Sequence, residues 1–199
     1  LSNSLKGVEQ LIETAEKNKL IALIAYQFRF HPGLRKFREI IDSGRLGRLL
    51  AAHVVNGEYV PDWHQYEDYR ETYPVRKDLG GGCLNVQTHE LDYSLWLFGL
   101  PRRAFAVGGH LSHLEADVED SVSMLLECES NGNPLPVHIH LDYLQRPPQR
   151  LCEVIGDDGH LIYNYYTNTV TIHDTAVSST ETITFRDFER NQMFIDLLT

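Results

Sequence analysis

The sequence predicts an α+β fold built on a mostly antiparallel sheet. Three observations predict it. The second half of the chain holds five or six segments in which apolar and polar residues alternate, turn motifs such as "NGNP" and "GDDG" join them, and helical periodicity precedes them. The chain has 199 residues, of which 42% are hydrophobic. That is enough for one sizeable core, or for a domain plus part of another.

Composition argues against several classes of protein. The formal net charge of −10 would repel a phosphate backbone, so we expect no nucleic-acid partner. No apolar run approaches the roughly 20 residues needed to span a bilayer, and the first ten residues do not resemble a signal peptide, so we expect no membrane contact and a cytoplasmic location. The cysteines are widely spaced and predict buried thiols rather than disulfides or a zinc ribbon: Cys83, Cys128 and Cys152.

The N-terminal segment predicts the end of a βαβ crossover. Residues 1–19 place apolar side chains on one helical face, which indicates an amphipathic helix. The run "LIALIAYQF" at 20–28 is almost continuously apolar, as is typical of a parallel strand buried on both faces. A helix followed by such a strand is half of a crossover whose other strands are missing. The sequence therefore indicates that the chain begins inside a domain.

The middle and C-terminal segments predict the body of the fold. A helix is expected at 32–42, a strand at 48–60 and a long polar, aromatic-rich loop at 61–78, of the sort that carries function. The alternating segments, and then a final helical pattern that stops without a cap, follow at 120–128, 135–144, 150–156, 159–166, 168–174, 181–187 and 188–199.

The stretch "LGGGCLNVQTHELDYSLWLFG" at 79–99 carries the candidate chemistry. Its periodicity predicts one helix over about 83–98, with Asn85, His89 and Asp92 sharing a polar stripe. An imidazole there could shuttle a proton at neutral pH. The alternative is an internal His89 that hydrogen-bonds Asp92 or a backbone carbonyl. Periodicity alone leaves both interpretations open.

Three glycines precede this helix. Gly80, Gly81 and Gly82 would let the backbone approach a ligand closely, and their N–H groups would lie at the positive end of the helix. Such a position favours anionic or hydroxyl-rich groups.

The chain resembles a known family in the ordered series "Y-x-x-R-F-x-P", "G-x-L-G" and "GGG-x-L-x(4)-H-x-x-D-x(6)-G", together with "RNQMFIDLL" near the end. These motifs are similar to those of the Gfo/Idh/MocA family of nicotinamide-dependent sugar and polyol oxidoreductases. The resemblance covers essentially the whole chain. Each motif is weak by itself, whereas their order is fairly specific.

The resemblance implies a two-domain enzyme. Residues 1–19 would be the last crossover helix of a truncated Rossmann domain, and residues 20–199 a substrate-binding and oligomerisation domain that is cut short at its C-terminus. That domain would be a large, open, mostly antiparallel sheet with helices on one face. The family binds NAD or NADP mainly through the Rossmann domain, and no G-x-G-x-x-G follows a strand here. Only a weak cofactor contact is therefore expected from Gly80, Gly81 and Gly82.

The resemblance also implies site roles. His89 would be the catalytic acid/base at a sugar or polyol hydroxyl or carbonyl, with Asn85 and Asp92 as substrate contacts. The family's catalytic lysine, in an E-K-P tripeptide, is absent from this sequence, so the chain alone is expected to be inactive. Many members carry an aspartate where Asn85 or Val86 stands. Asparagine cannot accept a proton at neutral pH, which puts a carboxylate-assisted relay in doubt.

Further substrate candidates lie outside the helix. Tyr26 and Arg29 sit where the family's strand end meets the cleft, although Arg29 could instead form a structural salt bridge. Trp63, Arg70 and Lys77 combine a flat apolar face with hydrogen-bond donors, which suits a sugar ring. The alternative is a solvated loop with one anchored tryptophan.

The predicted sheet also calls for a partner. A face without helices needs a cover, and we expect a homodimer or homotetramer to bury apolar residues there, namely Tyr163, Tyr165, Tyr166 and Val170. His138 and His140 share one side of a strand, which favours an interface or surface stripe over a metal pair, and no metal site is expected. A non-catalytic, self-associating sugar-binding module is the alternative to the enzyme.

Overall fold

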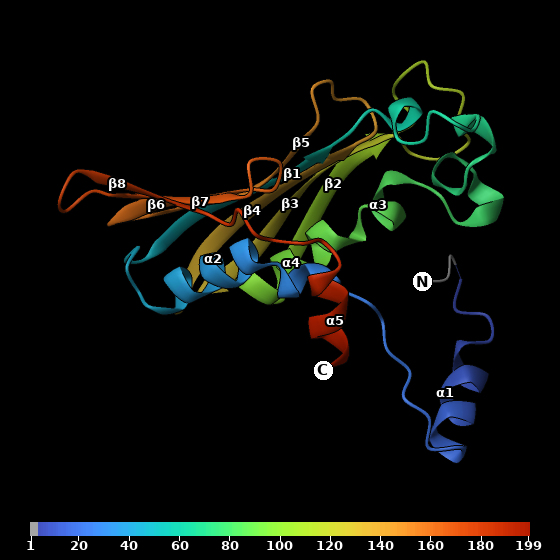
Figure 1. The fold of residues 1–199 in the computed structure, drawn as a ribbon, viewed down its shortest axis with the longest axis horizontal. Coiled ribbons are helices and arrows are strands. Elements are labelled where there is room, and N and C mark those ends of the chain that lie inside the picture. Colours follow the sequence, from blue (N-terminus) through green and yellow to red (C-terminus); the bar gives the residue numbers. More distant parts are fainter. Residues whose placement is uncertain (1–3) are drawn as a thin grey trace.

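A single eight-stranded sheet forms the centre of the computed structural model, which describes residues 4–199 (Figure 1). The strands are β1 (Leu49–Gly57), β2 (Arg103–Gly109), β3 (Ser121–Ser130), β4 (Asn133–Asp142), β5 (Gln149–Gly156), β6 (Gly159–Asn164), β7 (Thr169–Asp174) and β8 (Ser179–Thr184). Their order is β2-β3-β4-β1-β5-β6-β7-β8, and only β1 and β4 pair in parallel. The predicted α+β class with a mostly antiparallel sheet is confirmed.

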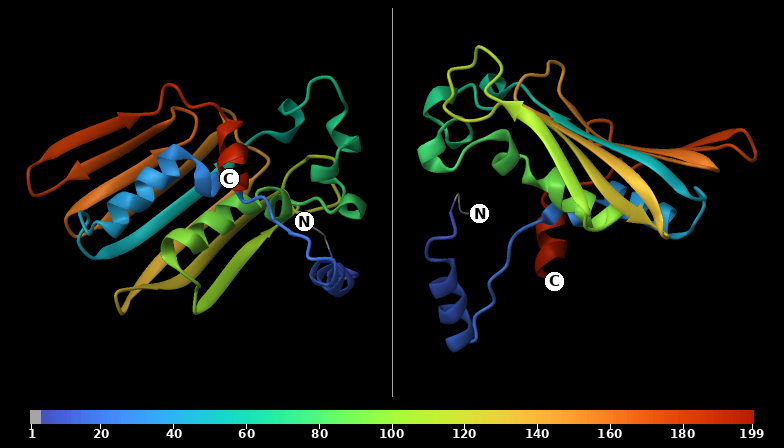
Figure 2. Two further views of the ribbon diagram at one scale, coloured as in Figure 1. Left: turned by 60° about the horizontal axis from the view of Figure 1, so that its bottom comes forward. Right: turned by 180° about the vertical axis from the view of Figure 1, so that it is seen from behind.

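Helices cover one face of this sheet and leave the other open (Figures 1 and 2). The α-helices are α1 (Val8–Lys17), α2 (Pro32–Asp42), α3 (Cys83–Val86), α4 (Thr88–Phe98) and α5 (Gln192–Leu198). Short 3₁₀ turns are η1 (Gln27–Phe30), η2 (Val60–Asp62), η3 (Tyr69–Glu71), η4 (Tyr73–Val75) and η5 (Lys77–Leu79). Helices α2 and α4 lie side by side across the covered face.

The core lies between this face and the two helices. Alternate residues of the inner strands point into it, so that on β4 Val137 and Ile139 are fully buried while His138 between them faces the open side. Helix α2 begins at Pro32, whose fixed φ suits a first turn, and the His31 Nδ1 accepts a hydrogen bond from the Gly33 N–H at 3.1 Å. These contacts fix the start of α2 directly after η1.

The prediction of a strand at 20–28 is wrong. Residues 20–26 form no regular element, and the segment ends in η1. The side chain of Ile21 is 94% exposed. A strand buried on both faces needs neighbouring strands, and no strand described in residues 4–199 pairs with this segment. It instead links the body of the fold to α1, which lies apart and buries none of its residues (Figure 1).

Two further expectations need correction. The single helix expected at 83–98 is divided into α3 and α4 at Gln87, whose Nε2 donates to the Asp142 carbonyl at 3.0 Å across the fold. Strand β2 was not predicted from the sequence. It is an edge strand in which both sets of alternate residues are largely exposed, so it lacks the usual contrast between faces.

The aromatic residues expected on the open face lie elsewhere. Tyr163 and Val170 are fully buried in the covered core, where a Cβ on Gly33 of α2 would come within 2.7 Å of the Tyr163 ring. The Tyr165 ring packs against Phe28, and the Tyr166 hydroxyl donates to Glu58. The prediction was wrong for Tyr163 and Val170, because alternation shows which residues share a face but not which face meets the helices. For Tyr166, which is 45% exposed, it stays a prediction.

Candidate functional site

A hollow of about 440 Å³ lies where the extended segment at 24–26 passes the start of α4. Its wall includes Tyr26, Gly80, Asn85, Thr88 and His89. The sequence singled out Tyr26, Gly80, Asn85 and His89 as site residues. It missed the other lining residues, which are Ile24, Ala25, Tyr73, Leu79, Val86 and Thr88. The elements that hold them are far apart in the chain, and the core beneath η1 and α4 brings them together.

His89 is half-buried in the wall of this hollow. Its Nε2 lies 3.4 Å from the Gln27 Nε2, and its ring centroid is 4.8 Å from that of Phe28. The Nδ1 atom is buried and has no hydrogen-bond partner in the described residues 4–199. Burial lowers the pKa of His89 below its usual value. The imidazole is thus neutral at pH 7 and able to accept a proton. Within residues 4–199, His89 makes no hydrogen bond to Asp92 or to a backbone carbonyl, since its Nδ1 has no partner and its Nε2 has only Gln27.

Asp92 forms an ion pair with Arg29. The Arg29 Nε and Nη2 atoms donate to the two carboxylate oxygens at 2.8 and 2.6 Å. The hydrogen bond to Asp92 raises the pKa of Arg29. Both residues were expected to bind substrate, and each is the other's main partner here. The structural salt bridge considered for Arg29 is therefore present, and a substrate role for either stays a prediction.

A second ion pair lies beneath His89 on the core side of α4. Glu90 is fully buried and accepts hydrogen bonds from Arg150 Nε at 2.7 Å and from Asn56 Nδ2 at 3.1 Å. The Arg150 guanidinium stacks over the Phe28 ring, 4.3 Å from its centroid. This pair supports the aromatic ring that contacts His89. Sequence reasoning missed it, because Glu90 and Arg150 are 60 residues apart and carry no local signal.

The three glycines are held by internal contacts. Their N–H groups donate to the carbonyls of Lys77, Arg76 and Pro74, respectively. A Cβ on Gly81 would collide with the carbonyl oxygens of Tyr73 and Pro74, and one on Gly82 with the Glu119 carboxylate. The helix that follows, α3, has only four residues. The expected cofactor contact at Gly80, Gly81 and Gly82 therefore finds no free N–H donor and stays a prediction without geometric support.

Lys77 belongs to a second hollow of about 580 Å³, which shares Gly80 and Asn85 with the first. The same hollow contains Asp117 and Glu119, two carboxylates that sequence reasoning did not single out. Lys77 is thus close to the candidate site without lining the hollow of His89.

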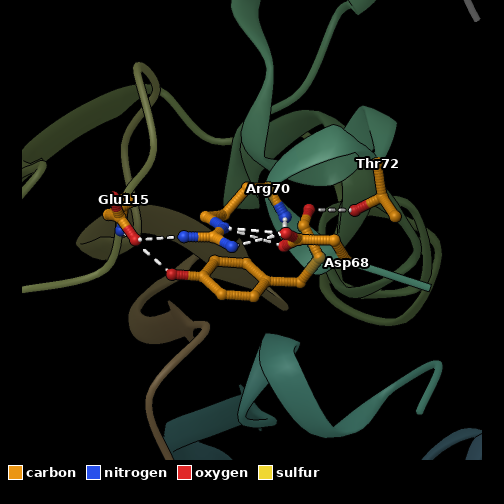
Figure 3. Close-up of polar contacts among 5 residues, drawn as sticks. Asp68, Arg70, Thr72 and Glu115 are labelled. Carbon is orange, nitrogen blue, oxygen red and sulfur yellow. Dashed lines mark hydrogen bonds and ion pairs between the residues drawn. The ribbon is translucent and has the colours of Figure 1, made fainter. Parts of the chain in front are cut away.

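Arg70 and Trp63 lie outside both hollows. Figure 3 shows the Arg70 guanidinium between two carboxylates, with Nη2 donating to Asp68 at 2.6 Å and Nη1 to Glu115 at 3.0 Å. These bonds raise the pKa of Arg70. Trp63 packs edge-on against Tyr143, with ring centroids 5.5 Å apart. The alternative of a loop with one anchored tryptophan describes this region, and a substrate role for either residue stays a prediction.

No helix described in residues 4–199 is long and apolar enough to cross a membrane.

Solved structures share this fold. The super-repressor mutant of Gal80p from Saccharomyces cerevisiae matches with a TM-score of 0.78 at 12% identity, covering 100% of this chain and 54% of that one. Levoglucosan dehydrogenase in complex with NADH matches with a TM-score of 0.73 at 17% identity, covering 89% and 54%. The present chain thus spans about half the length of each.

Sequence comparison gives the family. Inositol 2-dehydrogenase 3 from Saccharopolyspora erythraea is 25% identical over 169 residues, which are 80% of this chain and 44% of that protein. The model of the GFO/IDH/MocA C-terminal domain matches residues 34–162, which include β1, α4 and the hollow's helical wall. This chain is therefore a member of the GFO/IDH/MocA family.

Proposed function

We propose that this chain is the substrate-binding part of an oxidoreductase that transfers hydride between NAD or NADP and a hydroxyl or carbonyl carbon of a sugar, sugar derivative or polyol. Family membership supports an oxidoreductase, and relatives named inositol 2-dehydrogenase and D-xylose 1-dehydrogenase support a sugar or polyol substrate. The observation that carries the proposal is the position of the half-buried His89 in the wall of a hollow large enough for a small molecule.

His89 would act on the proton of the reacting oxygen. An alcohol that is oxidised at carbon must lose its O–H proton, and a neutral imidazole in hydrogen-bonding reach can accept it. In the reverse direction the protonated imidazole returns the proton to the carbonyl oxygen. Gln27 and Phe28 hold the ring in place, and Asn85 supplies a polar side chain to the same hollow.

Residues 4–199 do not fit the dinucleotide. The glycine N–H groups are all used within the chain, and the space beside Gly81 and Gly82 is filled by protein atoms. We therefore propose that a domain outside this sequence binds the cofactor. The apolar surface of α1 and of residues 20–25, which this chain leaves exposed, is available to contact such a domain.

The test uses a longer protein in which this sequence is joined to the proposed nicotinamide-binding domain, supplied with sugars and polyols and monitored by nicotinamide absorbance. His89→Ala should lower turnover by about 100-fold or more, the usual contribution of a positioned acid/base group. His113→Ala, an exposed histidine outside both hollows, is the matched control and should keep full activity. Unchanged turnover of a folded His89→Ala protein would remove this residue from the mechanism.

A second candidate is a sugar-binding module without chemistry. The N–H groups of Gly80, Gly81 and Gly82 are all used within the chain and leave no donor for a dinucleotide, which favours this candidate. The same assay separates the two candidates. Sugar binding that persists in the longer protein without any turnover would favour the module.

We also propose that the open face of the sheet mediates homodimer or homotetramer formation. Its β2–β3 end presents Phe105 and Val107 and, on the neighbouring strand, Leu125, which are 67%, 61% and 50% exposed. Phe105 and Leu125 border a hollow of about 630 Å³ that also includes Pro134 and Pro136. An apolar patch of this kind supports contact with a second copy.

A further inference from the structure

We propose that the substrate site continues into the second hollow, which takes a neutral, hydroxyl-rich group. The preferred substrate is then a disaccharide or glycoside, with its reacting ring beside His89 and its second ring beside Lys77. This inference rests on the proposed function and names its substrate class.

The two hollows are neighbours with a common wall. One holds His89 and Tyr26, the other holds Lys77 and Asp117, and Gly80 and Asn85 line both. Their volumes are about 440 and 580 Å³, each within the roughly 300–1,000 Å³ of a typical small-molecule site. A single sugar ring beside His89 therefore leaves the second hollow unfilled.

The common wall is held by specific contacts. The Asn85 Nδ2 donates to the carbonyls of Gly80 and Gly81 at 3.4 and 3.2 Å, so the amide lies across the glycine loop. Gly80 has a φ of 85°, a conformation that glycine adopts without strain, and it carries no side chain into either hollow. The wall is formed by a glycine and an amide side chain, both small or polar, which suits a glycosidic linkage passing from one hollow to the other.

The polar groups of the second hollow match hydroxyls. Asp117 Oδ1 accepts from the Lys77 N–H at 2.6 Å and Glu119 Oε1 from the Leu84 N–H at 3.2 Å. Within residues 4–199, three further polar atoms have no hydrogen-bond partner: Asp117 Oδ2, Glu119 Oε2 and Lys77 Nζ. These two acceptors and one donor fit a sugar ring, whose hydroxyls both donate and accept.

The same charges disfavour an anionic group. Two carboxylates, Asp117 and Glu119, face one ammonium, Lys77, in the second hollow. A phosphate or nucleoside diphosphate would lie beside like charges there, and the glycine N–H groups that might have bound it are already used. The chemistry therefore favours an uncharged second ring over a sugar phosphate or a nucleotide sugar.

The test measures binding to the full chain by isothermal titration calorimetry. The probes are matched pairs, glucose with cellobiose and xylose with xylobiose, and glucose 6-phosphate as the anionic ligand. At least one disaccharide should bind about tenfold more tightly than its monosaccharide, as expected for two or three added hydrogen bonds.

Two variants test whether the second hollow accounts for the tighter binding of the disaccharide. Ala116→Phe fills the second hollow and should cancel the tenfold preference, whereas Ala176→Phe, the same substitution in the exposed turn between β7 and β8, should not. Lys77→Ser removes an exposed side chain and should reduce the preference about threefold, the effect of one lost hydrogen bond, even if Ala116→Phe fails to fold.

Each outcome has a separate meaning. Equal binding of both members of every pair would overturn the second subsite and leave the proposed function standing. Tighter binding of glucose 6-phosphate than of either disaccharide would overturn the neutral class. Binding of none of the probes would count against the proposed function itself.

Discussion

The two faces of the sheet are built from the same strands but are covered differently. On β3 and β4, Leu126, Val137 and Ile139 are buried under the helices, while Leu125 and His138 alternate with them on the open side. Strand register places five of the chain's ten histidines on that open side: His53, His138, His140, His160 and His173. The comparison teaches that the covered face supplies stability, whereas the open face is free to take part in association.

Polar residues occur on both faces, and their environments set what they contribute. The Glu90–Arg150 pair on the covered side has side chains that are 0% and 12% exposed. The Arg103–Glu127 pair on the open side has side chains that are 80% and 37% exposed. Burial makes the first pair costly to break, and solvent makes the second nearly dispensable.

The largest expected effect is therefore at Arg150. Arg150→Met leaves the Glu90 carboxylate buried without its main partner, and should lower the free energy of unfolding by about 3–5 kcal/mol in urea denaturation. Arg103→Met is the matched control on the open face and should cause no measurable loss. Equal stability of the two variants would contradict the claim that the buried pair contributes more to stability than the exposed one.

A double substitution sharpens this prediction. Glu90→Leu with Arg150→Met replaces the pair by apolar groups, and should recover most of the stability lost by Arg150→Met alone. Recovery in urea denaturation would show that the loss comes from the unpaired charge. Continued instability would instead assign it to the packing of Arg150 against Phe28.

The same distinction explains what the sequence could predict. Alternation along 120–174 repeats every two residues, so the strands β3 to β7 follow from it directly. The expected helical stripe grouped Asn85, His89 and Asp92. Asn85 and His89 both line one hollow although the break at Gln87 puts them in α3 and α4, whereas Asp92 pairs with Arg29 instead. These features depend on neighbours within a few residues.

The features that sequence missed depend on distant contacts. The apolar run at 20–28 has strand composition but no strand to pair with in the described residues 4–199. The N–H groups of Gly80, Gly81 and Gly82 looked free, yet carbonyls of residues 74–77 accept from them. No local pattern reveals that Glu90 meets Arg150, because that hydrogen bond joins residues 60 positions apart, which meet only in the folded chain.

A smaller effect is expected from a buried histidine on the covered side. His31 is fully buried, and burial, with a contribution from the Arg150 charge, lowers its pKa from 6.5 to about 4. The unfolded chain therefore binds a proton between those values while the folded protein does not, so stability is lost as pH falls through this window. The pKa shift corresponds to at most about 3 kcal/mol.

Urea denaturation at pH 7 and pH 4.5 tests the sign. His31→Asn keeps an acceptor for the Gly33 N–H but cannot titrate, so its stability should fall less between the two pH values than that of the unaltered protein. His173→Asn, on the exposed open face, is the control and should leave the pH dependence unchanged. An unaltered pH dependence in His31→Asn would assign acid destabilisation to other groups.

The smallest effect on stability, and the most direct test of the open face, is expected from Phe105→Asp combined with Leu125→Asp. Both side chains are largely exposed in the single chain, so the free energy of unfolding of the monomer should change by less than about 1 kcal/mol. Sedimentation velocity should nevertheless show a shift from dimer or tetramer to a 22.8 kDa monomer, because a buried carboxylate without a partner opposes association.

Val177→Asp places the same charge on an exposed apolar residue between β7 and β8 and should not dissociate the oligomer. If the unaltered chain sediments as a monomer at every concentration, the exposed apolar residues on β2 and β3 do not bind a second copy, and the open face needs a different cover.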